Sequence, residues 1–391
     1  MKTTPKVALL VETSNSYARE LLHGVRAWVR ENGPWSIRLT EQGRGADVPA
    51  WLKGWDGDGV IARVESARIA RELQATGLPV IDVSAALPSL VFPRVATDAE
   101  GAAQLAATHL IERGLRHFGY CGDQRFHWAR RRGEAFARAV RRGFGAGAGG
   151  GGRTAGRTCE MFAPAPGAVD DEVSAIAGWL KTLPRPVGVL ACLDLRGQQV
   201  LAACRLAGLS VPDEVAVIGV HNDELLCDLC DPPLSSVIPN AQRAGYVAAG
   251  LLAKAMAGKR LAVALHEIAP HGVASRQSTD VAAVADEKIA GAVRFMRQQA
   301  AGGTNVADVL HAVPMARTAL ERKFKAVLGT TPHAYLRKLR MERVQELLAT
   351  TSLPVGEIAA ATGFENPEYL SAMFRRECGV SPREWRARLR G

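Results

Sequence analysis

Two sets of polar side chains in this sequence have types suited to binding another molecule. The first set mixes groups that pair with the hydroxyls of a sugar and cover the apolar side of its ring. The second set is rich in groups that hydrogen-bond base edges and neutralise the phosphates of DNA. The first set comprises Ser14, Asn15, Tyr17, Arg63, Ser84, Trp128, Arg132, Asp194, Arg196, His221, Asn222 and Asp223. The second set comprises Arg317, Thr318, Arg322, Asn366, Glu368, Ser371, Arg375 and Arg376.

An α/β domain must position the first set, because short apolar runs alternate with amphipathic helical stretches up to residue 275. Such alternation predicts parallel sheets covered on both faces. The chain is expected to cross from a first group of strands to a second at residues 95–98 and to return at residues 234–239, which favours two lobes. A ligand of such a fold lies in the cleft facing the carboxyl ends of the strands, so polar residues after strands are the candidates. The expected strands are residues 6–11, 59–62, 80–83, 118–121, 188–191 and 215–219.

The second set falls on a pattern of short helix, tight turn and basic helix that occurs twice. Small Ala359 allows close helix crossing, Gly363 supplies the positive φ of a sharp turn, and Pro367 suits a first helical turn. The first turn of each basic helix should face base edges, while later residues such as Arg376 meet phosphates. The expected helices are residues 306–313, 317–325, 333–349, 355–362 and 367–376. Their expected buried side chains are Leu320, Phe324, Ile358, Phe364, Leu370 and Phe374.

These motifs carry a resemblance to known families. Residues 336–385 resemble the AraC-type DNA-binding domain, and residues 6–275 resemble the periplasmic-binding-protein fold of LacI-type regulators through residues 55–61, 95–98, 211–219 and 233–237. The order of the two parts resembles AraC-family regulators of the xylose-responsive XylR type. That resemblance implies a homodimeric activator of pentose-utilisation genes that binds promoter DNA and is switched by a sugar such as D-xylose between the lobes. RNA polymerase is a further partner that it implies.

Two positions depart from the pattern of sugar-binding regulators. His221 stands where such regulators carry aspartate, and a neutral histidine accepts only one hydrogen bond. Arg63 also stands where a carboxylate is expected. The effector could therefore be an acidic or otherwise altered sugar.

Composition is consistent with a DNA partner inside the cell. The formal net charge is +10, and residues 286–391 hold 17 basic and 11 acidic side chains, which favours displacement of counterions from phosphate. The seven cysteines include the spacing Cys227–Cys230 but no second pair, so we expect reduced thiols and no metal site. The N-terminal residues lead into a strand rather than an apolar signal segment, and no apolar stretch is long enough for a bilayer. These features predict a cytoplasmic protein without a membrane partner.

The expected organisation is a two-lobed α/β domain over residues 1–275, a linker over 276–286 and an all-α domain with two helix-turn-helix units over 287–391. The glycine-rich residues 143–152 are expected to form a surface loop, because no phosphate-loop Lys-Ser or Lys-Thr follows them. Two rival functions are open: a constitutive DNA-binding regulator with a degenerate sensing domain, and a carbohydrate-active enzyme. The second is disfavoured because no hydrolase elbow, zinc-protease motif or dinucleotide fingerprint occurs. No catalytic residue and no cofactor is therefore expected.

Overall fold

The computed structural model describes residues 4–41, 43, 46–142, 158–163, 172–280, 287–299, 303–328, 330–364 and 366–390. The chain divides into two compact parts, Met1–Val281 and Ala282–Gly391, called the N-terminal and the C-terminal domain below. The glycine-rich residues 143–152 and residues 281–286 of the expected linker lie outside the described residues. Residues 276–280 belong to the N-terminal domain.

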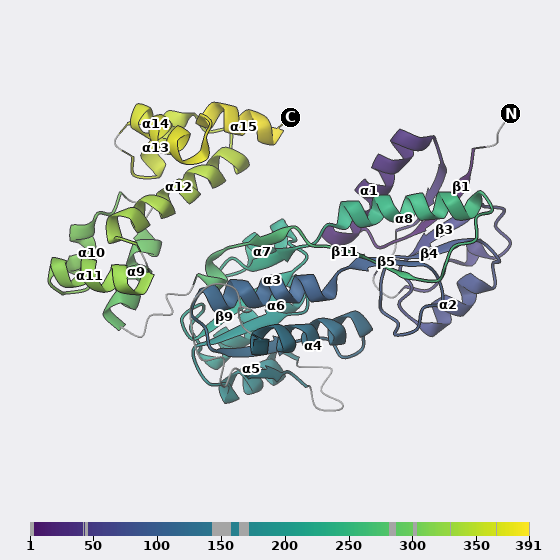
Figure 1. Ribbon diagram of the computed structural model, residues 1–391, viewed down its shortest axis with the longest axis horizontal. Helices are drawn as coiled ribbons and strands as arrows, with labels where there is room; N and C mark the ends of the chain where they lie inside the picture. The colour runs from purple at the N-terminus through teal and green to yellow at the C-terminus, as the bar shows by residue number, and fades with distance from the viewer. Residues whose placement is uncertain are drawn as a thin grey trace. The chain divides into compact units, whose positions relative to one another are not determined.

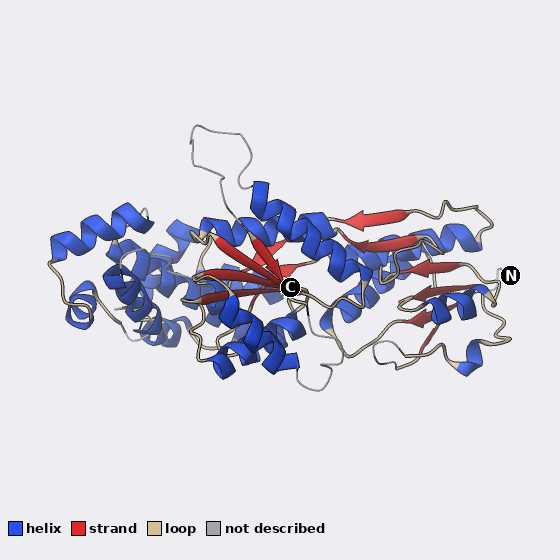
Figure 2. Ribbon diagram, turned by 90° about the horizontal axis from the view of Figure 1, so that it is seen from below, coloured by secondary structure: helices blue, strands red, loops and turns tan. Residues whose placement is uncertain are grey.

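The first lobe of the N-terminal domain is built on a six-stranded sheet with the order β11-β5-β4-β3-β1-β2 (Figures 1 and 2). All its neighbouring strands pair in parallel. Strands β1 and β3 are almost fully buried, whereas β2 at the edge is exposed. The strands are β1 (Lys6–Leu10), β2 (Ser36–Leu39), β3 (Gly59–Ala62), β4 (Val80–Asp82), β5 (Arg94–Thr97) and β11 (Leu265–Ile268).

Helices α1 (Ser16–Asn32) and α8 (Ala241–Met256) lie side by side on one face of this sheet (Figure 1). Their backbones approach so closely that a Cβ on Gly24 would lie 1.9 Å from the carbonyl oxygen of Gln242. Helix α2 (Ala67–Gln74) and the short 3-10 helix Ala50–Leu52 supply apolar side chains to a separate core. The sheet is thus buried between two apolar layers, as its uninterrupted apolar strands require.

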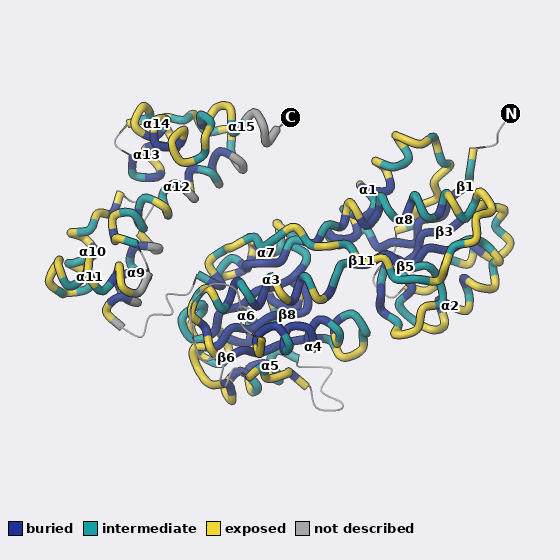
Figure 3. The backbone as a smooth tube through the Cα atoms, viewed as in Figure 1, coloured by how far each residue is buried: buried dark blue, intermediate teal, exposed yellow. Residues whose placement is uncertain are grey.

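The second lobe has a six-stranded sheet with the order β12-β10-β9-β8-β6-β7, in which only β12 pairs antiparallel among the described strands. The inner strands are buried (Figure 3). The strands are β6 (His117–Cys121), β7 (Cys159–Met161), β8 (Val187–Ala191), β9 (Val215–Val220), β10 (Ser235–Ile238) and β12 (Gly272–Ala274). Its helices are α3 (Ala99–Glu112), α4 (His127–Arg142), α5 (Glu172–Thr182), α6 (Asp194–Ala207) and α7 (Glu224–Leu229), with a 3-10 turn at Gln277–Thr279.

The strand orders confirm the two predicted crossings between lobes, after β5 and after β10. A third crossing joins β11 to β12 and was not expected from the sequence. Strands β2, β7, β11 and β12 were also missed, because each is short and none is a fully buried apolar run. The two-lobed α/β architecture itself is confirmed.

The C-terminal domain is all-α, as predicted, and contains two helix-turn-helix units with separate apolar cores. The buried side chains expected in both units are found there, and Gly363 has the positive φ of +69° expected at the turn. None of the described helices combines the length and apolar character needed to cross a bilayer. The helices are α9 (Glu287–Gln299), α10 (Val306–Ala312), α11 (Arg317–Leu328), α12 (Pro332–Thr350), α13 (Val355–Ala361), α14 (Pro367–Cys378) and α15 (Pro382–Arg390).

Candidate effector site and DNA-binding surface

Direct contacts join the two lobes at the carboxyl ends of β1 and β9. The ring of Tyr17, at the start of α1, stacks on His221 with centroids 4.7 Å apart. The backbone N–H of Ser16 donates to Oδ2 of Asp223 at 3.3 Å. The hydroxyl oxygen of Ser16 is buried without a hydrogen-bond partner. The structure therefore brings Tyr17, His221 and Asp223 together, as the rule of strand ends predicts.

Two further contacts cross between the lobes. The N–H of His127, at the start of α4, donates to the carbonyl of Ala86 at 3.0 Å. Arg131 on α4 pairs with Glu267 on β11 at 3.2 Å. The lobes thus touch through α4 as well as through β1 and β9.

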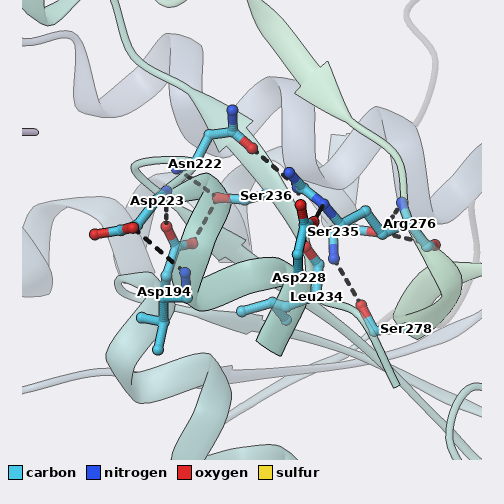
Figure 4. Close-up of polar contacts among 10 residues, drawn as sticks. Asp194, Asn222, Asp223, Asp228, Leu234, Ser235, Ser236, Arg276 and Ser278 are labelled. Carbon is cyan, nitrogen blue, oxygen red and sulfur yellow. Dashed lines mark hydrogen bonds and ion pairs between the residues drawn. The ribbon is translucent and has the colours of Figure 1, made fainter. Parts of the chain in front are cut away.

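The loop after β9 is supported by hydrogen bonds to the carboxylate of Asp194, the first residue of α6 (Figure 4). Asp194 accepts the N–H of Asp223 at 2.8 Å and the hydroxyl of Ser236 at 2.6 Å. Burial raises the pKa of the Asp194 carboxyl to about 6, although both hydrogen bonds act in the opposite direction. His221 has a φ of 119°, a value that residues other than glycine adopt only under constraint. Asn222 follows with a φ of 51°, in the left-handed region that asparagine tolerates. The loop is therefore a constrained structure with a buried carboxylate as its support.

Arg63, at the end of β3, lies between two buried carboxylates. Its guanidinium is 2.7 Å from Glu65 and 3.7 Å from Glu12, and both glutamate side chains are 5% exposed. Burial acts against the charge of Arg63, and attraction to Glu65 and Glu12 more than offsets it, so the pKa of Arg63 is raised. The three side chains border a small pocket. Glu12 and Glu65 thus supply carboxylates beside Arg63, the position at which the pattern of sugar-binding regulators predicts one.

Arg132 on α4 is a buried cation with unused hydrogen-bonding capacity. It is 4% exposed, one terminal nitrogen donates to the carbonyl of Cys192, and its Nε has no partner. Its guanidinium lies 5.3 Å from the ring of Trp128, which itself stacks on Phe126. The charge is thus directed inward and does not belong to a solvated basic face.

The remaining predicted effector residues make contacts within their own lobes. Arg196 forms a bidentate salt bridge with Glu172, with N–O distances of 3.1 and 3.3 Å. Asn15 caps α1 by accepting the N–H of Ala18, and the hydroxyl of Ser84 lies 2.9 Å from Asp82. Ser14 is exposed. The structure does not bring these four side chains to the contact between Tyr17 and His221.

Glu12, Glu65 and Ser16 were overlooked in the sequence. Glu12 and Ser16 follow the first strand closely, so the rule that selected Ser14 and Tyr17 also covers them. Glu65 follows Arg63 by two residues. All three residues therefore lie within a few positions of a strand end in the sequence, but other residues in the same loops were selected instead.

The predicted DNA-binding residues lie on the second helix of each helix-turn-helix unit or at its start. Arg317, Thr318 and Arg322 are exposed on α11, and Arg317 pairs with Glu321 at 3.2 Å. Asn366 accepts the N–H of Tyr369 at 2.7 Å and so caps α14. The remaining side chains on α14 are half-buried or exposed: Glu368, Ser371, Arg375 and Arg376.

Three family models match successive parts of this chain. Residues 6–99 match the XylR N-terminal domain, residues 107–279 a periplasmic binding protein-like domain and residues 309–388 a helix-turn-helix domain. The chain is 29% identical over 389 residues to the xylose operon regulatory protein of Escherichia coli (strain K12), covering 97% of this chain and 96% of that protein. Over nearly its whole length the chain is thus similar to AraC-type transcription regulators of the XylR type. The xylose operon regulatory protein of Haemophilus influenzae is 28% identical over 394 residues, covering 97% of this chain and 98% of that protein.

Solved structures agree with this assignment. The structure of the xylose-binding transcription activator XylR is 27% identical, has a TM-score of 0.74, and the match covers 99% of this chain and 98% of that one. The transcriptional regulator CelR in complex with cellobiose shares the fold of the N-terminal part, at 22% identity and a TM-score of 0.54 over 71% of this chain and 86% of that one. This chain is a DNA-binding transcription regulator and not an enzyme.

Proposed function

We propose that this chain activates transcription in response to D-xylose or a closely similar pentose bound in the N-terminal domain. The observation that carries the proposal is the likeness over 99% of the chain to a xylose-binding transcription activator. Xylose operon regulatory proteins from two bacteria are similar over 97% of it. The polar residues near the contact between the lobes give the chemistry a sugar needs.

The charges around Arg63 favour a neutral sugar over a sugar acid. Arg63 is paired with Glu12 and Glu65, so this group carries a net negative charge and offers no free cation to a carboxylate. A sugar hydroxyl, in contrast, can donate to either glutamate. The presence of arginine at this position is therefore compatible with a pentose.

The effector should act by changing the balance between two arrangements of the lobes. The contacts of Tyr17 with His221 and of Ser16 with Asp223 already join the lobes. A sugar that binds the joined arrangement more tightly than an open one shifts the population toward it, whereas a sugar indifferent to both shifts nothing. We further propose that the protein is a cytoplasmic homodimer that contacts promoter DNA and RNA polymerase. Its effector-sensing part ends near residue 280, and its DNA-binding part begins near residue 287.

Calorimetry and footprinting on the full-length protein test the proposal. D-Xylose should bind, while D-xylonate should bind at least tenfold more weakly because the net negative charge of Arg63, Glu12 and Glu65 repels a carboxylate. DNA from a random pool selected by the protein should then be protected differently with and without D-xylose. Protection that no pentose alters, with no heat of binding, would instead support a constitutive regulator.

A further inference from the structure

The end of the N-terminal domain is anchored in the core of the second lobe. Ser278 and Thr279 are fully buried. The hydroxyl of Ser278 donates to the carbonyl of Val217 at 2.6 Å, and that of Thr279 lies 2.6 Å from the hydroxyl of Ser235. Residues 281–286 follow directly in the chain and lead to α9. Any shift of residues 276–280, called the exit segment below, therefore changes where the connection to the C-terminal domain begins.

Arg276 joins this exit segment to the loop after β9 (Figure 4). Its Nη1 donates to Oδ1 of Asn222 at 2.9 Å and to the carbonyl of Leu234 at 3.1 Å. Its Nε donates to Asp228 at 2.7 Å. The side chain is only 16% exposed. A largely buried guanidinium that lost these acceptors would have to move, since an unsatisfied buried charge is costly.

Asn222 is itself fixed by the groups that support the candidate effector site. Its backbone N–H donates to the hydroxyl of Ser236 at 3.0 Å, and that hydroxyl donates to Asp194 at 2.6 Å. Asp194 also accepts the N–H of Asp223. The path from Asp223 to Arg276 is thus an unbroken series of hydrogen bonds between side chains and backbone.

We propose that Arg276 is a positioning residue that transmits the conformation of the loop at residues 221–223 to the exit segment, and so to the DNA-binding domain. The proposal rests on the proposed function, because the loop must respond to a sugar. A sugar that contacts His221, Asn222 or Asp223 stabilises the loop conformation in which the Asn222 amide accepts from Arg276. The planar guanidinium then holds the exit segment in one position through several fixed hydrogen bonds. A flexible lysine, whose donors all lie on one nitrogen, would hold it less firmly.

The test compares Arg276→Gln with Arg113→Gln in the full-length protein. Arg113 is a matched control, because it donates to Ser275 at 2.9 Å and to the carbonyl of His109, and both lie outside the loop. Calorimetry gives the dissociation constant for D-xylose, and fluorescence anisotropy gives the constant for selected DNA with and without the sugar. The coupling factor is the ratio of the two DNA constants, and it is reciprocal by linkage.

We expect Arg276→Gln to bind D-xylose within about threefold of wild type while its coupling factor falls to within about twofold of one, below the roughly 5–150-fold range of ordinary allosteric coupling. Arg113→Gln should keep the wild-type factor, and Arg276→Lys should recover part of it. An unchanged factor in Arg276→Gln, or an equal loss in Arg113→Gln, would overturn the proposal.

Hydrogen exchange on ligand-free protein separates failure of this proposal from failure of the proposed function. If the wild-type protein binds no pentose, the proposed function fails. The hydrogen-bonded link between the loop at residues 221–223 and the exit segment can still be measured. Arg276→Gln should speed exchange at residues 221–226 and 277–280 together, whereas Arg113→Gln should not affect residues 221–226. Faster exchange of only one of these two segments in Arg276→Gln would refute the link.

Discussion

Asp194 supports the loop after β9 from a position that is 2% exposed. In the unfolded chain its carboxyl ionises near pH 4, and in the folded chain its pKa is about 6. Between these values the folded state holds more protons, so raising the pH lowers the free energy of unfolding; above pH 6 the full cost is present. The cost is about 3 kcal/mol, because one pKa unit corresponds to about 1.4 kcal/mol.

The Asp194→Asn variant removes this titration while keeping the shape. Its amide oxygen can accept from the N–H of Asp223, and its amide nitrogen can donate to the hydroxyl of Ser236. Denaturant unfolding followed by tryptophan fluorescence, which arises mainly from the N-terminal domain, should show the wild type losing stability relative to the variant between pH 4 and 6.5. Parallel pH profiles of the two proteins would show that Asp194 is not the titrating group.

Arg132 is expected to donate to the sugar through its unpaired Nε. A hydrogen bond from a charged group is worth about 1.5–3 kcal/mol, so Arg132→Gln should weaken D-xylose binding by roughly tenfold to a hundredfold. Arg130→Gln, on the same helix but exposed, should bind D-xylose as the wild type does. Calorimetry on both variants decides the matter, with thermal melting to check that each is folded. Equal affinities would remove Arg132 from the site.

At the scale of elements, the turn between α13 and α14 depends on Gly363. A Cβ at this position would lie 2.5 Å from Cα of Gly303, and φ is +69°. Gly379, after α14, has a similar φ of +75° but open space around it. Gly363→Ala should therefore destabilise the C-terminal domain by more than the roughly 1 kcal/mol expected for Gly379→Ala. Circular dichroism during urea unfolding measures both, and equal losses would mean that Gly303 can move aside.

Residues in the first turn of a recognition helix should read bases, whereas residues near its end should contact phosphates. Arg317 on α11 and Arg376 on α14 test this difference. Arg317 is 69% exposed and its pair with Glu321 is weak, so its guanidinium is available at the first turn of α11. Arg317→Ala should relax sequence choice at one operator position, costing about 1–3 kcal/mol on the preferred base. Arg376→Ala should weaken all sequences alike and reduce the slope of log K against log salt by about one. Selection from a random pool, repeated at several salt concentrations, distinguishes the two effects.

At the scale of the whole molecule, sugar binding should stabilise the N-terminal domain by mass action. At a hundredfold excess over the dissociation constant the gain is about 2.7 kcal/mol. Scanning calorimetry of the full-length protein with D-xylose should raise the unfolding temperature of the N-terminal domain, while L-glucose at the same concentration should leave it unchanged. A shift produced equally by both sugars would indicate a solvent effect rather than a site.

The sequence predicted the larger elements because their periodicity is local. The apolar run of β9 and the pattern of α14 each contain the residues that bury them. Strands β11 and β12 were missed because Leu265–Ile268 and Gly272–Ala274 are only partly buried and acquire strand geometry from partners distant in the chain. The third crossing between lobes was missed for the same reason.

The candidate site was predicted less completely than the fold. The rule that ligands lie at the carboxyl ends of strands found Tyr17, His221 and Asp223, whose contacts join the lobes. It also selected Asn15 and Ser84, whose side chains bond within their own lobe. Both kinds of residue follow strands, and a one-dimensional pattern does not tell which direction a side chain takes.

By itself, the amino-acid sequence determined the two-lobed α/β domain and the tandem helix-turn-helix units, because both follow from local periodicity and turn chemistry. The class of regulator came from the resemblance of these parts to known families. Only the tertiary structure decided which charges are paired and which are free. Arg63 gains Glu12 and Glu65, Arg196 gains Glu172, and the Nε of Arg132 stays unpaired. The link from Asn222 to Arg276 likewise spans 54 positions of sequence. Electrostatic pairing depends on distance in space, which the spacing of residues along the chain does not encode.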